Sequence, residues 1–177
     1  MRTVSENEWY QIGLYDITEK AILLLEETPP ASIFISYARA ESSALALLIL
    51  ARLKEHGLSA FLDMHPDREG LAVGDDWHAK LEEVVASNDN FIILIGQHTL
   101  NSPYVRQEIE WAHKYNKAIY PIWHNDFRGL KDNPSYEITE AIQYAIGTVN
   151  ATIVEAENPK QYNAALDELL SSFGIVP

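Results

Sequence analysis

The sequence has no cysteine and few basic residues, and each shortage excludes certain kinds of site or partner. Without cysteine, the 177-residue chain has neither a disulfide framework nor a thiolate metal site, which is compatible with the cytoplasmic location that we expect. Its 13 Lys and Arg stand against 26 Asp and Glu, which gives a formal charge of -13. The few cations are scattered along the chain. Because such a charge repels a phosphate backbone, we expect no nucleic-acid partner.

Long apolar runs are also missing. Residues 1–8 do not combine a basic region with an apolar one, and no apolar run approaches the roughly 18 residues of a membrane span. We therefore expect a soluble protein with no membrane partner. The hydrophobic content of 47% over 177 residues suits one sizeable core rather than two.

The common signatures of nucleotide-binding and hydrolytic enzymes are absent as well. The sequence has no GxGxxG, GxxxxGK[ST] or GxSxG, and its six histidines do not form HExxH. Ser36-Tyr37 and Gly96-Gln97 stand where a phosphate-accepting receiver domain needs acidic residues for magnesium. We expect no metal and no bound cofactor.

Short apolar segments alternate with helical patterns along most of the chain. The segments predict strands over residues 32–37, 58–63, 91–95, 118–123 and 151–154. Helices are predicted over 5–27, 41–56, around 77–85, over 102–116 and 134–146, and from 158 onward. Pro121 suggests an end or edge position for its strand.

This alternation is typical of a parallel sheet whose strands are joined by right-handed crossovers. The predicted fold class is α/β: a flavodoxin-like five-stranded parallel sheet with helices on both faces, plus an extra N-terminal helix. Residues 1–30 form the N-terminal extension, and residues 31–177 form the domain. Because ligands gather at the carboxyl ends of parallel strands, the loops after Tyr37, Asp63 and Ile95 are the expected place for a site.

Five segments, taken in order, resemble the TIR (Toll/interleukin-1 receptor) domain family over about residues 31–174. Phe34-Ile-Ser-Tyr-Ala-Arg39 is similar to the family's first strand, and Phe61-Leu-Asp63 to its second. Residues 64–76 resemble the mobile BB loop, and Gly74-Asp-Asp-Trp77 the loop-to-helix junction of prokaryotic members. Ser102-Pro-Tyr-Val-Arg-Gln-Glu-Ile109 resembles the segment that carries the glutamate of NAD-cleaving members.

The resemblance implies an NAD glycohydrolase with Glu108 as its catalytic residue. NAD is then the substrate, and the products are nicotinamide and ADP-ribose or a cyclic ADP-ribose isomer. The implied setting is bacterial immune signalling against phage, with a downstream effector or a fused sensor as partner. The resemblance also implies self-association through the 64–76 loop, in an open, head-to-tail and filamentous arrangement.

The spacing of residues in the predicted helix from Ser102 also indicates the surroundings of Glu108, independently of the family resemblance. A helix from Ser102, turned by about 100° per residue, places an apolar stripe inward at Val105, Ile109 and Ala112. An adjoining stripe holds Tyr104, Glu108, Trp111 and Tyr115. Glu110 falls on the far side beside Arg106, where we expect a solvated ion pair. Glu108 is therefore the carboxylate expected against apolar and aromatic surface.

Further substrate-binding candidates surround the predicted site, and each has a structural alternative. Trp77 is expected to stack on a base, or equally to be a core tryptophan. Arg39 is a forked donor for the pyrophosphate, or else pairs with Glu41 on the surface. The other substrate-binding candidates are Ser36 and Tyr37 on the pocket floor, Gly74 and Trp111.

Two other functions stay open at this point. A TIR domain can act as a scaffold by homotypic association without chemistry. A nucleoside deoxyribosyltransferase-like enzyme has a related fold and related glutamate chemistry. The first-strand segment and the long 64–76 loop favour the TIR interpretation over the second alternative.

Overall fold

A computed structural model describes residues 32–63, 75–130 and 134–176, with the backbone alone for residues 75–77. The helix predicted over residues 5–27 and the 64–76 loop up to Gly74 lie outside the described residues. The side chain of Trp77 also lies outside them. The boundary at residue 30 and the role of that loop stay predictions.

Five parallel strands form one sheet in the order β2-β1-β3-β4-β5. The strands are β1 (Ser32–Ser36), β2 (Ser59–Leu62), β3 (Asn90–Ile95), β4 (Ala118–Trp123) and β5 (Thr152–Ile153). This order confirms the predicted α/β, flavodoxin-like fold class. It also places a topological switch point between β1 and β3, where ligands bind in sheets of this kind.

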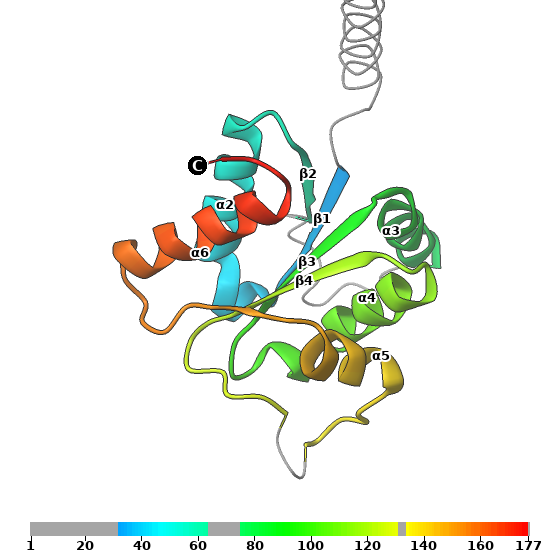
Figure 1. Cartoon of the computed structure of the whole chain (residues 1–177). Helices are drawn as coiled ribbons and strands as arrows, with labels where there is room; N and C mark the ends of the chain where they lie inside the picture. The colour runs from blue at the N-terminus through cyan, green and yellow to red at the C-terminus, as the bar shows by residue number, and fades with distance from the viewer. Residues whose placement is uncertain (1–31, 64–74, 131–133, 177) are drawn as a thin grey trace, which may run out of the picture. The chain divides into compact units, whose positions relative to one another are not determined.

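Helices cover both faces of the sheet (Figure 1). They are α2 (Arg39–Glu55), α3 (Asp75–Ser87), α4 (Pro103–Lys114), α5 (Glu140–Gln143) and α6 (Pro159–Ser172). Helices α2 and α6 lie on one face, and α3, α4 and α5 lie on the other. Adjacent residues of β1 supply both cores, because Ile33 and Ile35 face α2 and α6 while Phe34 faces α3 and α4.

Local sequence signals set the helix ends that matter for the site. The hydroxyl of Ser102 accepts a hydrogen bond from the backbone N–H of Val105, and Pro103 occupies the first turn, as predicted. Helix α2 ends at Glu55, and Gly57 then takes a φ of 75°, a conformation that glycine adopts without a steric penalty. Asn158 caps α6 in the predicted way.

The chain departs from the predictions mainly after β4. The helix predicted over 134–146 is shorter: Thr139 caps α5, and a π-helical turn follows over Tyr144–Thr148. Strand β5 is reduced to two residues. The edge position suggested by Pro121 is wrong, since β4 lies between β3 and β5. The proline is tolerated because β5 pairs only with Ile122 and Trp123 of β4.

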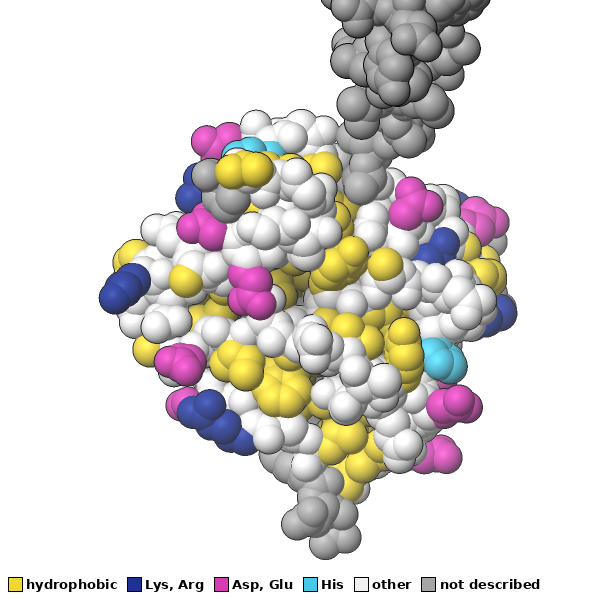
Figure 2. Space-filling view, viewed as in Figure 1, with side chains coloured by type: hydrophobic (Ala, Val, Ile, Leu, Met, Phe, Trp, Pro, Cys, Tyr) yellow, Lys and Arg dark blue, Asp and Glu magenta, His cyan; other side chains and the backbone are white. Residues whose placement is uncertain are grey.

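The surface shows no gathering of basic side chains on the face drawn in Figure 2, where Lys and Arg are dispersed among acidic residues. None of the helices in the described ranges is long and apolar enough to cross a membrane.

Candidate functional site

Glu108 is a buried carboxylate on the second turn of α4. The residue is 2% exposed, and its Oε2 accepts a hydrogen bond of 2.6 Å from the hydroxyl of Ser36. Ser36 ends β1 and is 1% exposed. The sheet therefore holds the carboxylate from one side while α4 carries it from the other.

The faces of α4 follow the predicted helical wheel. Val105, Ile109 and Ala112 are completely buried against the sheet. The expected ion pair between Arg106 and Glu110, however, is wrong. Arg106 donates to the carbonyl oxygens of Leu100 and Asn101 and stacks over Tyr136. Glu110 accepts a hydrogen bond from Thr139, the N-cap residue of α5. The sequence did not indicate that these two side chains meet.

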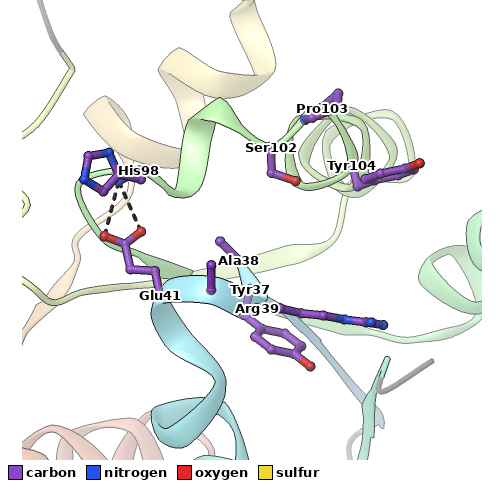
Figure 3. Close-up of a pocket in the computed structure, with 9 residues that line it drawn as sticks. Tyr37, Ala38, Arg39, Glu41, His98, Ser102, Pro103 and Tyr104 are labelled. Carbon is purple, nitrogen blue, oxygen red and sulfur yellow. Dashed lines mark hydrogen bonds between the residues drawn. The ribbon is translucent and has the colours of Figure 1, made fainter. Parts of the chain in front are cut away.

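A cavity of about 320 Å³ opens at the switch point between β1 and β3. One wall is the end of β1 and the start of α2, from Tyr37 to Glu41, and the other consists of His98 and the first residues of α4 (Figure 3). Ser102, Pro103 and Tyr104 line that second wall. Glu108 is not one of the lining residues, but it follows the lining residue Tyr104 by one helical turn, and its partner Ser36 immediately precedes the lining residue Tyr37.

Arg39 contributes a guanidinium group to the first wall. Its Nη2 lies 3.9 Å from Oδ1 of Asp63, and the side chain is 27% exposed. Its Nε and Nη2 are buried, and no described residue accepts a hydrogen bond from either. Buried donors normally have acceptors, so these two are suited to an anionic ligand. The Tyr37 hydroxyl donates to the carbonyl oxygen of Asp63 at 3.0 Å and ties β1 to the end of β2.

Glu41 does not pair with Arg39, and the two side chains point in opposite directions (Figure 3). The Glu41 carboxylate accepts hydrogen bonds from the His98 backbone N–H, the Thr99 hydroxyl and the Asn125 side-chain amide. Burial alone would raise the pKa of this carboxyl, but the hydrogen bonds from Thr99, Asn125 and His98 outweigh it and the pKa is lowered. Glu41 therefore stays ionised at neutral pH.

His124 lies behind this wall and is 3% exposed. Its Nε2 is 2.8 Å from the Ser42 hydroxyl, and its Nδ1 is 3.8 Å from Oε1 of Glu157. Burial lowers the pKa of His124, and the carboxylates of Glu157 and Glu41 offset this only in part. The neutral imidazole is thus favoured, and it joins α2 to the end of β4.

Trp111 is placed differently from the other predicted site residues. Its side chain is 7% exposed and packs in the core between the sheet, α3 and α4. It meets the ring of His78 edge-on at 6.4 Å, and His78 in turn stacks on Tyr104 at 5.9 Å. Trp111 is not among the residues that line the cavity, and its ring contact with His78 leads to Tyr104, which does line it.

Of the predicted site residues, Tyr37 and Arg39 line the cavity, whereas Ser36 and Glu108 are bound to each other outside its lining. The sequence did not indicate Glu41 or His98 as parts of the cavity wall. The sequence feature related to Glu41 is Gly96 after β3. A side chain at position 96 would occupy the space that the Glu41 carboxylate fills, which becomes clear only from the structure. In the described residues, no three His, Asp or Glu side chains gather as a metal site would require.

Solved structures with the same fold include the TIR domains of a resistosome and two enzymes. The TIR domains of the activated Roq1 resistosome, which recognises the pathogen effector XopQ, have a TM-score of 0.60 at 12% identity. The match covers 80% of this chain and 98% of that one. A CMP N-glycosidase of Clostridium botulinum, BcmB, has a TM-score of 0.50 at 21% identity and covers 78% and 99% of the two chains.

A 2-deoxyribosyltransferase of Bacillus psychrosaccharolyticus has a TM-score of 0.50 at 12% identity. The match covers 83% of this chain and 98% of that one. None of the curated proteins matches the chain. The family model described as "TIR domain" matches residues 33–168.

Proposed function

Because the chain belongs to the TIR domain family, as the match over residues 33–168 shows, we propose that it is an NAD glycohydrolase. Glu108 is the proposed catalytic residue. The observation that carries the proposal is the buried Glu108 carboxylate, held by Ser36 beside a cavity at the β1/β3 switch point. The resemblance of residues 102–109 to the NAD-cleaving members supports the same assignment.

One carboxylate is sufficient for this reaction. Most glycosidases need a second carboxyl group to protonate the leaving oxygen. In NAD the nicotinamide nitrogen is already cationic, and the ring departs neutral with the electron pair of the broken C–N bond. The remaining charge lies on an oxocarbenium-like ribose. A carboxylate beside it stabilises that charge, and does so more strongly in a water-poor position such as that of Glu108.

The cavity walls suit the rest of the substrate. A volume of about 320 Å³ is at the low end for small-molecule sites and fits one nucleotide half of a dinucleotide. Arg39 supplies buried donors for a phosphate oxygen, and Tyr104 and Tyr37 supply aromatic surface. Water as the acceptor gives ADP-ribose, and the adenine of the same molecule gives a cyclic isomer. We place this chemistry in bacterial immune signalling, with self-association through the 64–76 loop.

A second candidate is cleavage of another N-glycosidic bond. Two proteins that share the fold act on such bonds, one as a CMP N-glycosidase and one as a 2-deoxyribosyltransferase. Cleavage of NAD, of CMP and of a deoxynucleoside each leaves positive charge on a sugar carbon, which a buried carboxylate can stabilise. The position of Glu108 therefore also suits a nucleotide or nucleoside.

A substrate panel separates the candidates. The protein is incubated with NAD, with CMP, and with a deoxynucleoside plus a second base, and the bases are separated by chromatography. Nicotinamide released from NAD, with neither cytosine release nor base exchange, is the expected result. Cytosine release or base exchange without nicotinamide would favour the second candidate. If no bond is cleaved and sedimentation shows concentration-dependent association, the chain is a scaffold.

A further inference from the structure

The two walls of the cavity are joined by one side chain. Glu41 belongs to the first turn of α2, on the wall that begins with Tyr37. Its carboxylate accepts hydrogen bonds of 3.1 and 2.9 Å from the His98 N–H and the Thr99 hydroxyl, which belong to the segment between β3 and α4. That segment leads directly into the opposite wall at Ser102 and Pro103.

The same carboxylate also holds the loop after β4. The Asn125 amide donates to Oε1 of Glu41 at 2.8 Å, and the Asn125 backbone N–H donates to Glu157 at 2.7 Å. Asn125 and Asp126 have φ values of 49° and 55°, a left-handed conformation that Asn and Asp adopt more readily than most other residues with a side chain. The carboxylates of Glu41 and Glu157 therefore both bind this turn, and Glu41 joins it to the β3–α4 segment.

Space for the Glu41 carboxylate exists only because residue 96 is glycine. A Cβ at Gly96 would lie 2.4 Å from Cδ of Glu41 and 2.5 and 2.8 Å from its two oxygens. The φ of Gly96 does not fall in the left-handed region, so its backbone accepts alanine, and the three atoms nearest to the added Cβ all belong to the Glu41 carboxyl group. Gly96 and Glu41 thus form a matched pair.

We infer that Glu41 is a positioning residue that sets the separation of the two cavity walls and thereby the affinity for substrate. The inference rests on the proposed function, because it assigns the cavity to NAD. Glu108 does not depend on Glu41 for its place, since Ser36 binds it and the neighbouring Val105 and Ile109 fix α4 in the core. Loss of Glu41 therefore weakens binding and leaves the chemical step largely intact.

Steady-state kinetics of NAD cleavage test this division. In Glu41→Ala we expect KM to rise about tenfold while kcat changes less than about threefold, because a displaced wall removes contacts that ground state and transition state share. Glu55→Gln is the matched control: Glu55 is an exposed carboxylate on the same helix, pairs with Arg52 and should leave KM unchanged. A Glu41→Ala enzyme with wild-type KM, or with a kcat loss alone, overturns the inference.

A double-mutant cycle tests the pairing with Gly96. Gly96→Ala should displace the carboxylate and raise KM as Glu41→Ala does. In the double variant the added methyl group meets no carboxylate, so its KM should equal that of Glu41→Ala instead of showing the product of both effects. Independent, multiplicative effects would contradict the pairing.

Hydrogen exchange provides a readout that does not need turnover. Amides of residues 96–102 should exchange faster in Glu41→Ala than in wild type, and those in Glu55→Gln should not. Unchanged exchange in this segment overturns the positioning role. If the wild type cleaves no NAD, the proposed function fails, and faster exchange in Glu41→Ala then shows that Glu41 orders the cavity wall whatever the cavity binds.

Discussion

Ser36 donates a hydrogen bond of 2.6 Å to Oε2 of Glu108 and so joins the carboxyl end of β1 to the second turn of α4. Both side chains are buried, at 1% and 2% exposure. A hydrogen bond to a charged group is stronger than a neutral one, and burial protects it from competition by water. The Glu108 carboxylate is therefore oriented by the sheet before any substrate binds.

Removing the Ser36 hydroxyl should impair this orientation. For Ser36→Ala we expect kcat for nicotinamide release to fall about tenfold, a typical effect of losing one hydrogen bond to a charged group. KM should change little, because the cavity walls are untouched. Ser171→Ala is the control, since that hydroxyl donates only to a carbonyl one turn back in α6. Unchanged kcat in Ser36→Ala would show that the bond does not serve catalysis.

Arg39 should matter only for substrates that carry phosphate. We expect Arg39→Ala to raise KM for NAD roughly tenfold, because a charge-assisted hydrogen bond is lost. KM for nicotinamide riboside, which has no phosphate, should be the same as in wild type. Initial rates over a range of both substrates measure the difference, with Arg52→Ala as a control on the same helix. An equal rise for both substrates would mean that Arg39 acts through the fold.

Trp111 should affect stability more than binding, because its side chain packs in the core rather than along the cavity. Trp111→Phe leaves a gap among buried neighbours, and we expect a loss of about 1–3 kcal/mol in the free energy of unfolding. KM for NAD should stay within about twofold of wild type. Denaturant unfolding measures the loss of stability, and steady-state kinetics measure KM. A raised KM with undiminished stability would restore the substrate-binding role predicted for Trp111.

His124 should make stability depend on pH. Its pKa is lowered in the folded protein by burial, against the opposing effects of Glu157 and Glu41. Stability from the neutral ring is then present above the ordinary pKa of 6.5 and is lost as the pH falls through that value toward the lowered one. Wild type should therefore have a lower Tm at pH 5.5 than at pH 7.5.

The variant His124→Gln tests this assignment by thermal denaturation at both pH values. Glutamine does not titrate, so the fall in Tm between the two values should shrink. The exposed His56 serves as control, and His56→Gln should keep the wild-type fall. A His124→Gln protein with the full wild-type difference would assign the pH dependence to other groups.

Local patterns in the sequence were sufficient for the strands, most of the helices and the face of α4 that carries Glu108. The Ser102-Pro103 pair marks the start of α4, and the 3.6-residue period then fixes which face carries Glu108. These features depend on residues close together in the chain. The same is true of Gly57 and Asn158, which end and begin helices as expected.

Features that depend on distant residues were not predictable in this way. Pairing with Glu41 was one of two alternatives for Arg39, its near neighbour, but Glu41 binds Thr99 and Asn125, which are 58 and 84 positions away. Glu110 was assigned to Arg106 and instead binds Thr139, 29 positions away. One sequence does not reveal which of several polar side chains a carboxylate will meet, because that choice is made by the packing of the helices.

Nicotinamide release by wild type, Glu108→Gln and Glu110→Gln is the most direct test of the central claim. The two glutamates lie two positions apart on α4, one buried beside the cavity and the other bound to Thr139. We predict that Glu108→Gln lowers the rate at least about a hundredfold, as loss of a charge-stabilising group does, and that Glu110→Gln stays near wild type. Equal release by wild type and Glu108→Gln would contradict the account.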